Sequence, residues 1–95
     1  MLINRTRANK VFVSAAGIHK TLGITCANNY ELATKHAIMN SGAERILLAD
    51  SSKFGSVQKT LFGKLEDFDK IITDNNLHEE WADFIRARDV ELVMI

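Results

Sequence analysis

The stretch Ile-Leu-Leu-Ala-Asp-Ser-Ser-Lys-Phe-Gly, residues 46–55, contains the transition that decides the fold. Residues 46–49 are a short apolar run, which is typical of a buried strand. Residues 50–55 are a polar loop that begins as soon as the apolar run ends. In α/β proteins, ligands bind beyond the carboxyl ends of parallel strands. The stretch therefore predicts one strand of a parallel sheet followed directly by a candidate binding loop.

Further apolar runs on either side of this stretch predict more strands. Residues 11–15, 71–73 and 90–95 are rich in valine, isoleucine and leucine and read as strands. Helical segments separate these runs, so strands and helices alternate along the chain. Alternation of this kind predicts an α/β fold, partially Rossmann-like, with a mainly parallel sheet. The loops after Ser14, Ala49 and Thr73 should then meet at one edge of the sheet.

The first predicted helix lies between the strands over residues 11–15 and 46–49. Asn28 or Asn29 can cap its start, and Glu31 falls in its favourable first turn. Gly42 is placed to end it. The helix therefore occupies most of the stretch from Asn28 to Gly42.

The second predicted helix precedes the last strand. Asn75 or Asn76 is its expected cap. Four large apolar residues recur at helical spacing on one face, namely Leu77, Trp81, Phe84 and Ile85. This spacing favours core packing over stacking on nucleic-acid bases.

The remaining segments carry weaker signals. Gly17 and Gly23 predict a loop after the first strand. Residues 56–62 read as a short strand, and residues 65–68 as a single helical turn.

Length and charge narrow the class of protein. The chain has 95 residues, enough for one small domain. Twelve basic and twelve acidic residues cancel, which argues against a basic nucleic-acid-binding surface. A single cysteine, Cys26, excludes a disulfide within the chain and fits a reducing cytoplasm. Residues 1–10 do not resemble a signal peptide, and no apolar run reaches the ~20 residues of a membrane span.

The loop at residues 50–55 is the sharpest candidate site. The hydroxyls of Ser51 and Ser52 can donate to phosphate oxygens, and the ammonium of Lys53 can neutralise them. The alternative is a solvated loop in which Asp50 acts only as a cap, since the pattern is not a Walker-type phosphate loop. Pattern alone favours that alternative.

Glu31 and Lys35 form a second candidate cluster together with Gly23 and Thr25. The two charged residues are four apart on the first helix and share one of its faces. An exposed pair of this kind contributes about 0.3–0.5 kcal/mol and needs no function. Spacing alone therefore favours a surface ion pair over a binding role.

Metal binding and nucleophilic catalysis find little support. His19, His36 and His78 have no metal-ligand spacing, and nothing orients Cys26 beside a histidine. No two predicted helices are joined by the short turn of a helix-turn-helix. We expect no metal, no cofactor and no direct DNA contact by these residues.

Read together, the segments resemble the DeoR family of bacterial regulators. Residues 11–19 resemble the family's strand and glycine turn, and residues 23–35 its Gly-x-Thr…Glu-x-x-x-Lys pattern. Residues 46–55 resemble its apolar strand followed by Asp-[Ser/His]-Ser-Lys-Phe-Gly, and residues 71–74 resemble a later element. Four motifs in order cover residues 8–95, nearly the whole chain.

The resemblance implies a function and a site. Family members sense phosphorylated or nucleoside-derived sugars and leave DNA when the effector binds, and their sensing domain is similar to ribose-5-phosphate isomerase and CoA-transferase folds. It implies that residues 1–95 are the C-terminal part of such a domain, without the helix-turn-helix domain. Ser14 to Gly17, Cys26 and Asn28 are most similar to the branch that responds to deoxyribonucleosides, so deoxyribose 5-phosphate is an expected effector. The implied ligand-binding residues are Gly17, Thr25, Glu31, Lys35, Asp50, Ser51, Ser52 and Lys53.

An isomerase-like enzyme fragment is the rival interpretation. In the resemblance to ribose-5-phosphate isomerases, the catalytic glutamate falls at Lys35, and the acidic turn falls at Ser14 to Gly17, which has no carboxylate. A lysine ammonium is a poor proton acceptor at neutral pH, so we expect no catalysis. Glu31 is one helical turn from Lys35, so the enzyme interpretation stays open.

A bare oligomerisation module is the third interpretation. Half of an α/β sheet exposes an edge and an apolar face, so we expect a homo-oligomer, most simply a dimer.

Overall fold

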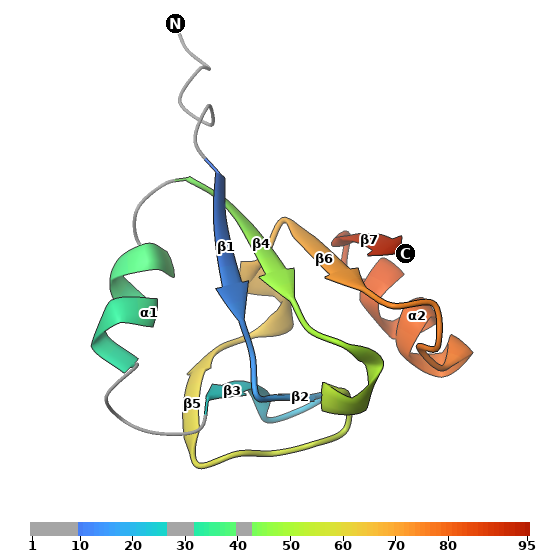
Figure 1. The fold of residues 1–95 in the computed structure, drawn as a ribbon, viewed down its shortest axis with the longest axis horizontal. Helices are drawn as coiled ribbons and strands as arrows, with labels where there is room; N and C mark the ends of the chain where they lie inside the picture. The colour runs from blue at the N-terminus through green and yellow to red at the C-terminus, as the bar shows by residue number, and fades with distance from the viewer. Residues whose placement is uncertain (1–9, 27–31, 40–42) are drawn as a thin grey trace, which may run out of the picture.

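A four-stranded parallel sheet forms one layer of the protein, in a computed structural model that describes residues 10–26, 32–39 and 43–95. Its strands are β1 (Lys10–Ser14), β4 (Glu44–Leu48), β6 (Lys70–Thr73) and β7 (Glu91–Met94). Their order in the sheet is β1-β4-β6-β7, and every neighbouring pair is parallel (Figure 1). The prediction of an α/β fold with a mainly parallel sheet is confirmed. The carboxyl ends of all four strands consequently lie at one edge.

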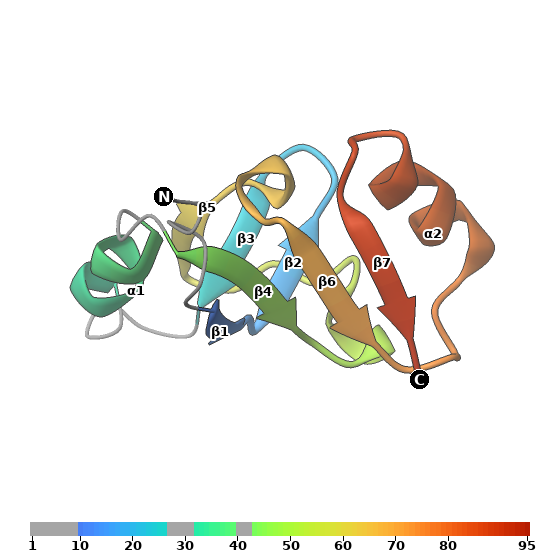
Figure 2. The same ribbon diagram turned by 90° about the horizontal axis from the view of Figure 1, so that it is seen from above.

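A second, antiparallel sheet of three short strands packs behind the first. It consists of β2 (Gly17–His19), β3 (Gly23–Cys26) and β5 (Thr60–Gly63), in the order β2-β3-β5. Figure 2 shows the two sheets as layers, with the parallel strands in front of β2 and β3. The loop predicted at Gly17 and Gly23 was wrong, because Ile18 and Ile24 pair across a hairpin and are both fully buried. The strand expected at residues 56–62 begins only at Thr60.

The first predicted helix is present as α1 (Leu32–Met39). It lies beside β5 at the β1 end of the sheet (Figure 1). Its expected caps, Asn28, Asn29 and Gly42, lie outside the described residues.

The second predicted helix is α2 (Glu79–Arg86), which lies beside β7. Its cap is not Asn75 or Asn76 but His78, whose ring Nδ1 accepts from the backbone N–H of Glu80 at 3.3 Å. Two short 3-10 helices complete the chain, η2 (Ser51–Lys53) and η3 (Leu65–Asp67). The second of these confirms the single turn expected at residues 65–68.

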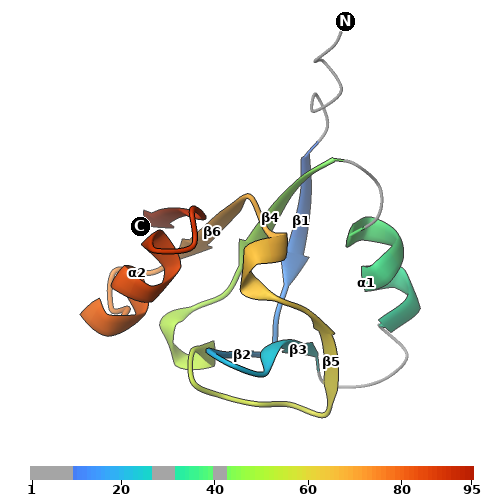
Figure 3. The same ribbon diagram turned by 180° about the vertical axis from the view of Figure 1, so that it is seen from behind.

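The hydrophobic core lies between the two sheets. Val13, Leu47 and Ile71 are in register on one face of the parallel sheet and are at most 2% exposed. Figure 3, seen from behind, shows η3, β5 and α2 on this side. Burial of each such aliphatic side chain contributes about 1.5–3 kcal/mol. The core thus fixes the strands whose ends form the candidate site.

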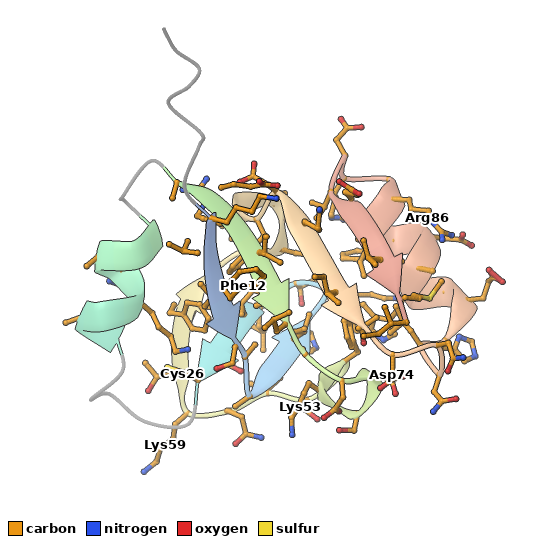
Figure 4. The ribbon with its side chains drawn as sticks, turned by 45° about the horizontal axis from the view of Figure 1, so that its top comes forward. Phe12, Cys26, Lys53, Lys59, Asp74 and Arg86 are labelled. Carbon is orange, nitrogen blue, oxygen red and sulfur yellow. The ribbon has the colours of Figure 1, made fainter. Side chains whose placement is uncertain are left out.

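The opposite face of the parallel sheet carries apolar side chains that are open to solvent. Phe12 is 57% exposed and Leu48 is 39% exposed. Figures 1 and 4 show that no described helix or strand lies over this face, and Phe12 projects from it. Parallel sheets are normally covered on both faces, so this surface is unusual for a monomer.

Candidate functional site

The loops that follow β4 and β6 meet at the carboxyl edge of the parallel sheet, as predicted. The backbone N–H of Ala49 donates to Ile72 O at 3.2 Å, which joins the two strand ends. Immediately beyond them, the backbone N–H of Ser51 donates to Asp74 Oδ2 at 2.9 Å. Figure 4 shows Lys53 and Asp74 at this edge. The polar residues that the sequence placed after these two strands therefore form one cluster.

Asp50 caps the short helix η2. Its Oδ1 accepts from the backbone N–H of Ser52 at 2.9 Å and also from the Ser52 hydroxyl. These hydrogen bonds from Ser52, helped by the positive charge of Lys53, hold the pKa of the Asp50 carboxyl below its usual range. Asp50 is therefore ionised at neutral pH and engaged in capping. It shapes the loop, whereas donors to a bound anion must come from the residues after it.

Asp74 ties the two loops together and was not among the predicted ligand-binding residues. Besides accepting from Ser51, it accepts from the backbone N–H of Asn76 at 2.9 Å through Oδ1. These two backbone hydrogen bonds lower the pKa of the Asp74 carboxyl. The available signal in the sequence was an aspartate at a strand end followed by two asparagines, which favours a local turn of this type.

Lys53 supplies the positive charge of the loop. Its side chain is partly exposed at the end of η2. In the described part of the chain, the ion pairs of the carboxylates involve other residues, and none involves Lys53. The ammonium is therefore available to an anion from solution.

Lys35 brings a second positive charge to the same edge from α1. It is 8% exposed, and its Nζ donates to Ser14 O, at the end of β1, at 2.8 Å. The ammonium also lies 4.9 Å from the centre of the Phe62 ring. The expected surface position was wrong for Lys35, because this side chain turns inward to the strand end. Its expected partner, Glu31, lies outside the described residues.

Gly17 and Thr25 lie beneath the loop rather than on its surface. Thr25 is 2% exposed, and its hydroxyl donates to Gly17 O at 3.2 Å and accepts from Gln58 N at 3.0 Å. A Cβ atom at Gly17 would be 2.5 Å from Ser56 O. The two residues thus hold the segment that leaves the loop, and the Thr25 hydroxyl is occupied within the protein.

A hollow of about 300 Å³ lies elsewhere, beside β5. Its lining is largely apolar and includes the exposed side chains of Leu22 and Leu61, together with Lys64 and Asp67. Among the predicted ligand-binding residues that the structure describes, none lines it. We therefore place the candidate site at the carboxyl edge of the parallel sheet, where the polar side chains of the loops after β4 and β6 lie.

The fold and the site define a class. A parallel α/β sheet with a cationic, backbone-anchored loop at its carboxyl edge has the architecture of a small-molecule-binding domain. Residues 1–75 match the family described as the DeoR C terminal sensor domain. The chain belongs to this family of sensor domains.

Its relatives are transcriptional regulators by name. The chain is 35% identical over 82 residues to the Deoxyribose operon repressor of Escherichia coli (strain K12), covering 86% of this chain and 32% of the relative. It is 28% identical over 89 residues to the HTH-type transcriptional regulator IolR of Bacillus subtilis (strain 168), covering 94% and 36%. It is 29% identical over 91 residues to the HTH-type transcriptional regulator GlpR of Haloferax volcanii, covering 96% and 36%. The chain spans about a third of the length of these relatives.

No described helix has the length and apolar character needed to cross a membrane.

Proposed function

We propose that this domain binds a phosphorylated sugar, such as deoxyribose 5-phosphate, as the effector of a DeoR-type repressor. One observation carries the proposal. The Lys53 ammonium lies at the carboxyl edge of the sheet and forms no ion pair with a described carboxylate, in a loop held by Asp50 and Asp74. A lysine ammonium is a compact cationic donor, which suits a phosphate group.

The predicted residues take different parts in this proposal. Lys53 and Ser51 contact the phosphate, while Asp50 and Ser52 shape the loop through their mutual hydrogen bonds. Lys35 adds positive charge from the end of β1. Gly17 and Thr25 support the loop from below, and Glu31 remains a proposed contact to the sugar.

We propose binding without turnover. The Lys35 ammonium donates to Ser14 O, and a group held as a hydrogen-bond donor is unsuited to removing a proton from a sugar. The names of the relatives support a regulator rather than an isomerase. We further propose that DNA is bound by another part of the regulator, in the cytoplasm, which agrees with the zero net charge of this chain.

A titration followed by NMR tests effector binding. Deoxyribose 5-phosphate, ribose 5-phosphate and inorganic phosphate are added separately to the labelled protein. We expect amide shifts at Ser51 to Gly55 and at Lys35, larger for one sugar phosphate than for inorganic phosphate. Equal shifts for all three would reduce the site to a general anion site, and no shifts at millimolar ligand would reject binding by this chain.

We also propose that the open sheet face joins two copies of the chain. Phe12 and Leu48 are its exposed apolar side chains. Ion pairs between Lys10 and Glu44 and between Lys70 and Glu91 lie at the amino ends of the strands. Light scattering should give a dimer at micromolar concentration, and Phe12→Glu should shift it to a monomer by placing a charge in the contact. A monomeric parent protein would contradict this interface.

A further inference from the structure

The candidate loop is joined to α2 by an aromatic contact. Phe54 directly follows Lys53, and its ring lies 5.2 Å from the Trp81 ring at an interplanar angle of 66°. Trp81 in turn lies 5.6 Å from Phe84 at 77°. Both pairs have the edge-to-face geometry that aromatic rings prefer. The side chain next to the proposed phosphate-binding lysine is thus packed on a helix distant in sequence.

Trp81 is itself held from a third segment. Lys20, in the turn between β2 and β3, places its Nζ 5.2 Å from the Trp81 ring centre and 5.4 Å from that of Phe84. Arg88 stacks on the other aromatic partner, with its guanidinium carbon 3.4 Å from the Phe84 centre. Cations over aromatic faces attract them electrostatically. The position of Trp81 is therefore set by residues outside the loop.

The backbone at Phe54 determines where η2 ends. Phe54 N–H donates to Ser51 O at 3.3 Å, and Gly55 N–H donates to Ile18 O at 2.7 Å. Phe54 also forms an isolated bridge with Ile18. Since Asp74 fixes the start of η2 through Ser51, the loop has one anchor at each end. Lys53 lies between these anchors.

We propose that Trp81 is a positioning residue for the Lys53 loop and acts through the Phe54 ring. The inference rests on the proposed function of this loop as a phosphate-binding site. Trp81 sets the end anchor, so the direction of the Lys53 side chain depends on a helix that does not contact the phosphate. Affinity for a sugar phosphate then depends on the packing of α2.

Binding measurements on Trp81 variants test the coupling. Trp81→Ala should weaken deoxyribose 5-phosphate binding by roughly 2- to 12-fold, the range expected for loss of one aromatic pair. Trp81→Phe retains a ring and should restore most of the affinity. Ile85→Val, a buried change on the same helix, is the matched control and should bind as the parent does. An equal loss in Ile85→Val would show general loosening of α2 and overturn the proposal.

A double-mutant cycle tests the route through Phe54. If Trp81 acts through the Phe54 ring, adding Trp81→Ala to a Phe54→Ala protein should cause no further loss of affinity. If the two losses instead multiply, Trp81 acts by another route and the assignment is wrong.

Hydrogen exchange separates this inference from the proposed function, because it needs no ligand. Trp81→Ala should speed exchange of the Gly55 and Phe54 amides, which bond to Ile18 O and Ser51 O, while Trp81→Phe should leave it near the parent rate. Unchanged exchange in Trp81→Ala would overturn the positioning role even in a protein that binds phosphate. Faster exchange in a protein that binds no sugar phosphate would retain the positioning role and reject the proposed function.

Discussion

Replacing Gly23 with alanine is expected to destabilise the domain by at least about 3 kcal/mol, which is a large part of the ~5–15 kcal/mol available to a domain. Gly23 has φ of 102°, a conformation that L side chains rarely adopt, and its added Cβ would lie 2.4 Å from Gly63 O. The clash is with the backbone of the neighbouring strand β5, so no side-chain rotation relieves it. The pairing of β3 with β5 must open to admit the methyl group.

Gly55→Ala is the matched control for this prediction. Gly55 also has a positive φ, 93°, but a Cβ there meets nothing within 4 Å. It should therefore cost only the conformational strain, about 1–2 kcal/mol. Thermal unfolding followed by circular dichroism compares the two. A Gly23→Ala protein that melts no lower than Gly55→Ala would show that β3 and β5 are not packed as closely as described.

Lys53→Ala is expected to remove measurable sugar-phosphate binding in the NMR titration. A hydrogen bond to a charged group contributes about 1.5–3 kcal/mol, which corresponds to a loss of roughly 10- to 150-fold in affinity. Weak binding by the parent would therefore fall below detection. The side chain is partly exposed and is not part of the core, so the variant should fold normally.

Lys59→Ala makes the same change of charge at an exposed position and serves as the control. Figure 4 places Lys59 apart from Lys53 and Asp74. It should bind within about twofold of the parent, since charges separated by more than a Debye length of about 8–10 Å are largely screened. Parent-like binding by Lys53→Ala would show that the phosphate site is elsewhere. Equal losses in both variants would indicate only a general attraction of the chain for anions.

The parallel sheet could be predicted because each of its strands is a local apolar run. Residues 46–49 and 71–73 carry enough consecutive branched side chains to specify buried strands without knowledge of their neighbours. The hairpin β2–β3 could not, since each strand has only one large aliphatic residue, Ile18 or Ile24, and its strand conformation comes from pairing and burial. Tertiary contacts decide such short segments.

The residue types of the candidate loop predict its position in the chain. The roles of its individual residues depend on contacts between elements, which only the structure shows. Helical spacing places Lys35 on the surface because it describes only one helix, whereas the side chain turns inward and its Nζ donates to Ser14 O, 21 positions away. The spacing likewise does not indicate the role of Asp74, since its hydrogen bond from Ser51 N–H joins two loops. The spacing of residues in the sequence indicates which of them are neighbours on one helix or strand, but it does not indicate contacts between different elements.

The parallel pairing of β1 with β4 also bears on how the chain folds. Phe12 pairs with Ile46, so the intervening residues must form a crossover before this pair contributes any stability. β6 and β7 are closer in sequence, with Lys70 opposite Glu91, and α2 lies between them. Closing the shorter loop costs less entropy, so the β6–α2–β7 unit is expected to be the nucleus onto which β4 and then β1 assemble. The strand that carries the exposed Phe12 would then be the last to join the sheet, and until it does β4 presents an unpaired edge to other chains.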